Sequence, residues 1–177
     1  MNNPWRITGT VALLILLSAP AYAELATIKH GDKWSSDQKE SDHDFRCPSN
    51  QVLVGRKHSG DENADTNFLC ATVFQKETLK TFNETKQNVG TWTYASCPEP
   101  KIMTGRGRSG DEEEPYWIYC SEVRDVWGHA LVPTWTSDKE GKESDHEAVC
   151  EKNQVLAGMR LSGDENGQTF YYCAELY

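Results

Sequence analysis

One stretch of the chain occurs three times, and it limits what the chain can fold into. Each copy begins and ends with a cysteine, and the two cysteines are 23 positions apart. Between them, every copy has the same glycine in its first half and the same Ser-Gly-Asp-Glu sequence near its middle. The copies run over residues 47–70, 97–120 and 150–173. A unit that recurs about every 50 residues with no internal gap predicts a repeat architecture with one shared core.

All six cysteines lie at the ends of these copies, which predicts three disulfides. Of all the ways of pairing six cysteines, only one treats the three copies alike. That pairing joins Cys47 to Cys70, Cys97 to Cys120 and Cys150 to Cys173. A zinc site is disfavoured, because one cysteine pair per copy supplies too few ligands for a closed site.

The first 23 residues are typical of a secretory signal peptide. Arg6 is their only charge, residues 7–17 are mostly apolar, and Ala-Tyr-Ala at 21–23 is a small-residue cleavage site. We therefore expect residues 24–177 to be a single exported domain, either periplasmic or secreted, made of three repeats (about 34–74, 90–124 and 134–177). No other apolar run is long enough to cross a bilayer, so no membrane insertion is expected.

The chain is acidic, with 27 Asp and Glu against 18 Lys and Arg and a net charge of −9. Nucleic acids bind through clustered cations that displace counterions. An acidic exported chain is therefore not expected to bind nucleic acid.

Each copy predicts a strand, a turn and a second strand. Ser-Gly-Asp-Glu supplies the turn residues, and the stretches 66–73, 116–123 and 169–176 are rich in aromatic and β-branched residues. The identical glycines Gly55, Gly105 and Gly158 indicate a bulge or a close backbone approach. The connection over 74–90 predicts one more strand and a loop. The fold class is therefore all-β with pseudo-threefold repeats, with a β-prism favoured and a β-trefoil as the alternative.

The acidic turns are the first candidate binding residues: Asp61, Glu62, Asp111, Glu112, Asp164 and Glu165. Paired carboxylates can ligate Ca²⁺ or accept hydrogen bonds from sugar hydroxyls. In the structural alternative, Asp caps the turn and Glu pairs with a cation such as Arg56, Arg106 or Arg160. No turn has the ligand density of an EF-hand loop, so no cofactor is expected and Ca²⁺ stays an alternative.

Aromatic side chains form the second set of candidates. By strand alternation Trp117 and Tyr119 share one face with Phe170 and Tyr172, while Tyr116, Ile118 and Tyr171 lie on the other. One face should be exposed and able to stack on sugar rings, although large aromatics are also common in cores. Trp34, Trp92 and Trp135 each precede the first cysteine of a copy. His58 and Arg108, just before two of the turns, complete the candidate set.

No catalytic residue is expected, although Ser41-Asp42-His43 and Ser144-Asp145-His146 contain the residue types of a hydrolase triad. Adjacent residues on a strand face opposite sides, so the aspartate cannot orient the neighbouring histidine. Copy two lacks this element. If the copies bind ligands, copies one and three are expected to bind alike and copy two to differ.

The segment Val52-Leu-Val-Gly55-Arg-Lys-His58-Ser59-Gly60-Asp-Glu62 resembles a motif of the dermatopontin family. It is also similar to a motif in the β-prism domain of bacterial membrane-attack-complex/perforin proteins. The resemblance covers about 24 residues per copy and implies a role in adhesion or glycan recognition. Both families have an Asp-Arg pair after the turn that this chain lacks, so no binding residue carries over.

The sequence thus predicts an exported, non-enzymatic binding module for carbohydrate or a cell-surface ligand, similar to a lectin or an adhesin. Three repeats provide avidity without tight single sites. The alternative is a periplasmic protein-binding inhibitor or immunity protein, since an acidic chain suits a basic protein partner.

Overall fold

The computed structural model describes residues 24–111, 113–163 and 166–177, and these contain fourteen strands and no helix. The all-β fold class is therefore confirmed. No helix in the described part of the chain could serve as a membrane span. The strands are β1 (Thr27–His30), β2 (Gln38–Lys39), β3 (Asp42–Arg46), β4 (Gln51–Ser59), β5 (Asp65–Gln75), β6 (Glu77–Thr78), β7 (Lys80–Val89), β8 (Tyr94–Ser96), β9 (Lys101–Ser109), β10 (Tyr116–Arg124), β11 (Pro133–Lys142), β12 (Asp145–Val149), β13 (Val155–Ser162) and β14 (Gln168–Leu176).

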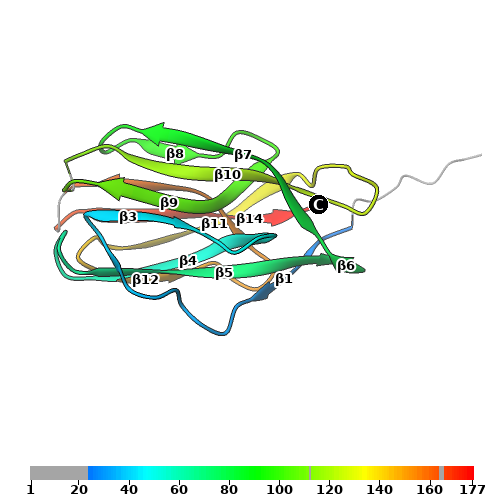
Figure 1. The fold of residues 1–177 in the computed structure, drawn as a ribbon, viewed down its shortest axis with the longest axis horizontal. Helices are drawn as coiled ribbons and strands as arrows, with labels where there is room; N and C mark the ends of the chain where they lie inside the picture. Colours follow the sequence, from blue (N-terminus) through cyan, green and yellow to red (C-terminus); the bar gives the residue numbers. More distant parts are fainter. Residues whose placement is uncertain (1–23, 112, 164–165) are drawn as a thin grey trace, which may run out of the picture.

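Each copy contributes one antiparallel hairpin, formed by β4–β5, β9–β10 and β13–β14. The turn of each hairpin contains a glycine with positive φ: Gly60 at 121°, Gly110 at 113° and Gly163 at 110°. Glycine adopts this conformation without a steric penalty, which explains its presence in all three copies. The hairpin turns lie at the end of the molecule opposite the C-terminus (Figure 1).

Three disulfides join Cys47 to Cys70, Cys97 to Cys120 and Cys150 to Cys173, as predicted. Each bridge connects the segment just before a hairpin to the second strand of the same hairpin. No described cysteine is free.

The repeated glycine in the first strand marks both a bulge and a close approach, as the sequence indicated. The register shifts beside Gly55, Gly105 and Gly158. A Cβ at Gly105 would lie 2.4 Å from the carbonyl oxygen of Phe45, and one at Gly158 would lie 2.5 Å from that of Ala95. These carbonyls belong to the short strands that precede the cysteines, so the glycine lets a neighbouring strand pack against the hairpin.

The short strand before each first cysteine pairs with the hairpin of a different copy. β3 of copy one pairs with β9 of copy two, β8 of copy two pairs with β13 of copy three, and β12 of copy three pairs with β4 of copy one. The copies are therefore interlocked through their backbones as well as packed side by side. This cyclic exchange holds the hairpins around a common interior (Figure 1).

The strands form one sheet that curls into a nearly closed tube, in the order β7-β10-β9-β3-β2-β5-β4-β12-β11-β14-β13-β8. The connections between copies supply β7 and β11, which flank β10 and β14. The strand predicted within 74–90 is thus confirmed. β1 and β6 pair with β5 outside this order.

The tube interior has an apolar part and a charged part. Val52, Ile102 and Val155 from the three hairpins pack together with Leu176 in an apolar cluster. Nearer the turns, the interior is occupied by charged and aromatic side chains, among them Arg56, Arg106 and Tyr171. Tyr116, Ile118 and Tyr171 face inward, and Trp117, Phe170 and Tyr172 are partly exposed on the outside, as strand alternation predicted. Tyr119, predicted to share the exposed face, is only 1% exposed. It is covered because Arg46 lies 4.0 Å from its ring centre and its hydroxyl donates to Asp44 at 2.6 Å.

Candidate functional site

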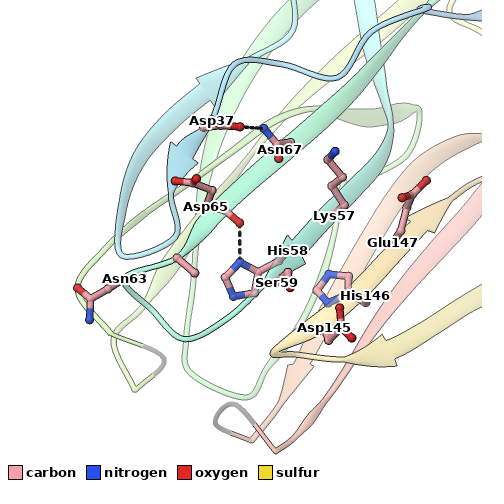
Figure 2. A pocket seen from close by; sticks show the side chains of 11 residues that line it. Asp37, Lys57, His58, Ser59, Asn63, Asp65, Asn67, Asp145, His146 and Glu147 are labelled. Atoms are coloured by element: carbon pink, nitrogen blue, oxygen red, sulfur yellow. Dashed lines mark hydrogen bonds between the residues drawn. The ribbon is translucent and has the colours of Figure 1, made fainter.

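An open pocket of about 760 Å³, here called the polar pocket, lies beside the turn of the first hairpin (Figure 2). Lys57, His58 and Ser59 of β4 form its centre, with Asp65 and Asn67 of β5 on one side. Asp145, His146 and Glu147 of β12 form the other side. The pocket therefore combines residues of copies one and three through the exchanged strand β12.

His58 is a buried residue of this pocket, and only one of its two ring nitrogens forms a hydrogen bond with a described group. It is 3% exposed, and its Nδ1 donates to the backbone carbonyl of Asp65 at 3.1 Å (Figure 2). A carbonyl can only accept, so in the neutral ring the Nε2 atom is an acceptor. No described group forms a hydrogen bond with that Nε2. Burial, followed by the charge of Arg56, lowers the pKa of His58.

His146, the other histidine of the pocket, is fully used by the protein. Its Nδ1 donates to the Lys142 carbonyl at 2.8 Å, and its Nε2 accepts from the Tyr171 hydroxyl at 2.7 Å and from Arg56 Nη1 at 3.2 Å. Because a guanidinium can only donate, this geometry requires a neutral imidazole. Burial and the charge of Arg56 lower the pKa of His146 to about 4.

Beneath the pocket lies a buried charge network, made of Glu40, Glu143, Arg56, Arg106, Arg108, His43 and His146. Arg56 Nη2 is 2.7 Å from Glu40 Oε2 and 3.2 Å from Glu143 Oε1. Glu40 also accepts from Arg106 Nη2 at 2.8 Å and from Arg108 Nη1 at 3.2 Å. Burial alone raises the pKa of Glu40, but the guanidiniums of Arg106 and Arg56 hold it well below its usual range.

His43 occupies the place in copy one that His146 has in copy three. Its Nδ1 donates to the backbone carbonyls of Lys39 and Glu40, both at 3.0 Å, and its Nε2 accepts from Arg106 Nη1 at 2.8 Å. Burial and the charge of Arg106 lower the pKa of His43 to about 3. Neither ring nitrogen contacts Ser41 or Asp42, so these residues do not form a triad.

A second depression, here called the aromatic groove, has a volume of about 410 Å³. Tyr94 of β8, Trp135 of β11 and Tyr172 of β14 line it, and Glu99 and Lys101 supply charged groups. Tyr94 meets Tyr172 edge to face, with ring centroids 4.6 Å apart and an interplanar angle of 85°. Trp135 is 61% exposed and Tyr94 is 49% exposed, so two large aromatic rings face solvent.

The acidic turns have mainly structural contacts. Asp61 Oδ1 accepts from the Asn63 amide and Asp111 Oδ1 from the Glu113 amide, both at 2.9 Å, so these aspartates cap their turns. Arg56 and Arg106, expected to pair with turn glutamates, pair with Glu40 instead, because both are buried at the charge network. Glu62 accepts from the Asn63 side chain at 2.7 Å. Three of the predicted turn residues, Glu112, Asp164 and Glu165, lie outside the described part of the chain.

The remaining candidates are dispersed over the fold. Arg108 is fully buried in the charge network. Trp117 lies over Gly107, donates through Nε1 to Asp44 at 3.1 Å, and is covered by the Lys86 ammonium 3.7 Å from its ring centre. Phe170 is half-buried on β14, on a different hairpin from Trp117.

Sequence reasoning missed the acidic members of the network and the groove. Lys-Glu-Ser-Asp-His occurs before the cysteine in copies one and three, so Glu40 and Glu143 were visible as a repeated pair. No signal in the sequence linked Tyr94 to Tyr172.

In residues 24–111, 113–163 and 166–177, no group of three or more His, Cys, Asp or Glu side chains is placed to hold a metal ion. The Ca²⁺ alternative therefore has no described site. Comparisons with protein-family models, with curated proteins and with solved structures found no match.

Proposed function

We propose that the protein is an exported, non-enzymatic binding module that recognises neutral carbohydrate through the aromatic groove. The observation that carries this proposal is the pair of exposed rings, Trp135 and Tyr94, beside the charged groups of Glu99 and Lys101. Aromatic faces stack on the apolar faces of sugar rings, while carboxylate and ammonium groups bond to hydroxyls. Export is supported by the three disulfides, which form in oxidising compartments.

The placement of the two rings on strands suits a preformed site. Trp135 is paired within β11 to Ala174 of β14, and Tyr94 is paired within β8 to Arg160 of β13. The Cys97–Cys120 disulfide begins directly after β8 and limits the motion of that short strand. A site held in this way loses little conformational entropy on binding.

The proposal includes a pseudo-threefold architecture, with a β-prism favoured over a β-trefoil. Support comes from the strand order, which can be divided into three consecutive groups of four strands, each with one complete hairpin. The cyclic exchange of β3, β8 and β12 adds further support. The copies differ in their surface residues, so the architecture does not imply three equal binding sites.

A glycan array followed by calorimetric titration of the best neutral glycan tests the function. Replacing Trp135 with Ala should weaken binding roughly tenfold or more, because a central aromatic anchor is worth at least about 1.4 kcal/mol. Trp127→Ala is the matched control, since Trp127 is 70% exposed and does not line the groove. Absence of neutral glycan binding, or equal losses in the two variants, would refute the proposal.

A further inference from the structure

The described interior of the tube carries one more positive charge than negative charge. Its buried charged side chains are three arginines and two glutamates: Arg56, Arg106, Arg108, Glu40 and Glu143. The three histidines buried beside them are mainly neutral at pH 7, because burial lowers the pKa of each. A buried charge without a counter-charge is costly. A binding site for an anion would remove that cost.

Arg108 is the arginine whose charge is compensated least. It is 0% exposed, and only its Nη1 has a partner, which is Glu40 Oε1 at 3.2 Å. Its Nε and Nη2 have no hydrogen-bond partner among the described residues. Arg106, by comparison, donates to Glu40 through both of its terminal nitrogens. Burial, followed by the charge of Arg106, lowers the pKa of Arg108 to about 10, so the guanidinium stays charged at pH 7.

The polar side chains around Arg108 are committed elsewhere. His43 of β3 and Tyr116 of β10 lie opposite Arg108 on the two neighbouring strands. The Tyr116 hydroxyl donates to a backbone carbonyl at 3.2 Å, and His43 Nε2 accepts from Arg106 at 2.8 Å. Glu40 already accepts hydrogen bonds from three arginines. The Nε and Nη2 edge of Arg108 therefore stays open to a ligand.

This open edge defines the chemistry of the ligand. Nε and Nη2 lie on the same side of the guanidinium and direct two parallel N–H bonds outward, which matches two oxygens of a planar oxyanion. A single negative charge balances the excess charge of the interior. Because Arg108 is fully buried, the anion must be small enough to be enclosed. Arg108 lies two residues before Gly110, at the turn end of the tube (Figure 1), where local opening of the turns admits a small ion.

We propose that Arg108 binds a small, planar, monovalent oxyanion of the formate or bicarbonate kind inside the tube, through its Nε and Nη2. A water molecule also accepts hydrogen bonds, but it leaves the excess positive charge in place, whereas the anion removes it. This site is separate from the aromatic groove and does not depend on carbohydrate binding there.

The test measures urea unfolding of the full mature chain, with its disulfides intact, at pH 7 in increasing sodium formate. Sodium gluconate replaces formate so that the ionic strength stays constant, and its anion has the same carboxylate but is too large to be enclosed. Above the dissociation constant of formate, each tenfold rise in its concentration should raise the folding equilibrium constant about tenfold. A stability that does not depend on formate would show that no anion binds, and would overturn the proposal.

Two Arg→Leu variants separate this site from general effects of charge. Leu161 occupies the position of copy three that corresponds to Arg108, three residues after the repeated glycine, so the fold already holds a leucine there. Arg108→Leu should abolish the dependence of stability on formate. Arg160→Leu removes the same charge from the exposed face of β13 and should keep that dependence. A formate dependence that persists in Arg108→Leu, or that disappears in Arg160→Leu, contradicts the proposed site.

If Arg108→Leu does not fold, the unmodified chain decides through NMR of its arginine Nε–H groups. Formate should shift the Arg108 Nε–H signal and approach saturation, because the anion accepts directly from that group. Gluconate should leave the signal in place. The Nε–H signal of the exposed Arg160 is the internal reference and should move with neither salt. An Arg108 signal that does not move, or that moves equally with both salts, overturns the proposal.

Discussion

Lowering the pH from 7 to 5 should destabilise the fold through His43 and His146. In the unfolded chain a histidine titrates near 6.5, whereas the pKa is about 3 for His43 and about 4 for His146 in the fold. Below pH 6.5 the unfolded chain therefore binds protons that the native state does not bind. The stability that the two neutral histidines contribute is fully present above pH 6.5, and it is lost as the pH drops from 6.5 towards 4.

The size of the effect follows from the two pKa shifts. At pH 5 both native pKa values lie below the pH, so each histidine lowers the free energy of unfolding by about 2 kcal/mol relative to pH 7. The two together give a loss of about 4 kcal/mol. Near pH 5.5 each contributes a slope of about 1.2 kcal/mol per pH unit. Their side chains are only 5% and 9% exposed, so solvent screens these shifts little.

Glu40 acts in a lower pH range. Its pKa is held well below the usual value of 4.5, so the stability that it contributes is present above pH 4.5 and is lost as the pH falls further. Measurements between pH 5 and 7 therefore report mainly on the histidines.

Urea unfolding followed by tryptophan fluorescence, at several pH values between 5 and 7, measures this dependence. His146→Gln keeps an acceptor for Arg56 but cannot take up a proton, so it should reduce the slope near pH 5.5 by about 1.2 kcal/mol per pH unit. His129→Gln is the control, because the His129 ring is largely exposed and lies outside the network. If the His146→Gln slope equals that of the wild type, the network does not hold this histidine neutral and the reasoning fails.

Two further predictions concern packing and the disulfides. Gly107→Ala should destabilise the fold by about 1–3 kcal/mol, because its Cβ would lie 2.3 Å from the Trp117 indole. A red shift of tryptophan emission should accompany this loss of stability. The control Gly90→Ala, whose Cβ has a nearest contact of 3.3 Å, should change neither the stability nor the emission. Replacing both Cys97 and Cys120 with Ala should lower the free energy of unfolding by about 3 kcal/mol through the freed loop; an unchanged urea midpoint would contradict this.

The features that the sequence predicted correctly either depend on one copy at a time or are repeated in every copy. The Cys47–Cys70 bridge joins residues of one hairpin, and Gly60 is required by the turn that it occupies. Gly55 was recognised as a site of close approach because every copy repeats it. For the disulfide and the turn, the repeated residue and its physical reason lie within about 25 positions. Gly55 differs, because the backbone that approaches it is the Ala148 carbonyl of another copy, which would lie 2.9 Å from an added Cβ. Its repetition in every copy was enough to expose it, although its partner was not predictable.

The features that the sequence could not predict depend on contacts between copies. Glu40 meets Arg106 across 66 positions, and nothing in either segment names its partner. The exchange of β12 onto β4 decides that Asp145 lies beside Ser59 and His146 beside His58, and this exchange creates the polar pocket. Pairing across copies depends on the closure of the whole sheet, which hydrophobic periodicity does not encode.

The interior also explains why the copies are not identical. Seven residues before the first cysteine, copies one and three have Glu40 and Glu143, whereas copy two has Gly90. One residue after the repeated glycine, copies one and two have Arg56 and Arg106, whereas copy three has Met159. Three identical copies would crowd three carboxylates and three arginines into the same buried space. Like charges in a buried space repel strongly, so the acidic and basic positions are distributed unequally.

The missing Ser-Asp-His element of copy two has a structural reason on this account. Four residues before the cysteine, copy two has Thr93 in place of His43 and His146, and it contributes the buried guanidiniums of Arg106 and Arg108 instead. Both histidines accept hydrogen bonds from arginines, one from Arg106 and one from Arg56. The Ser-Asp-His element therefore belongs with the glutamate that precedes it, as part of the acidic half of the network. Its absence from copy two reflects charge balance in the interior, and it does not by itself indicate a difference in ligand binding.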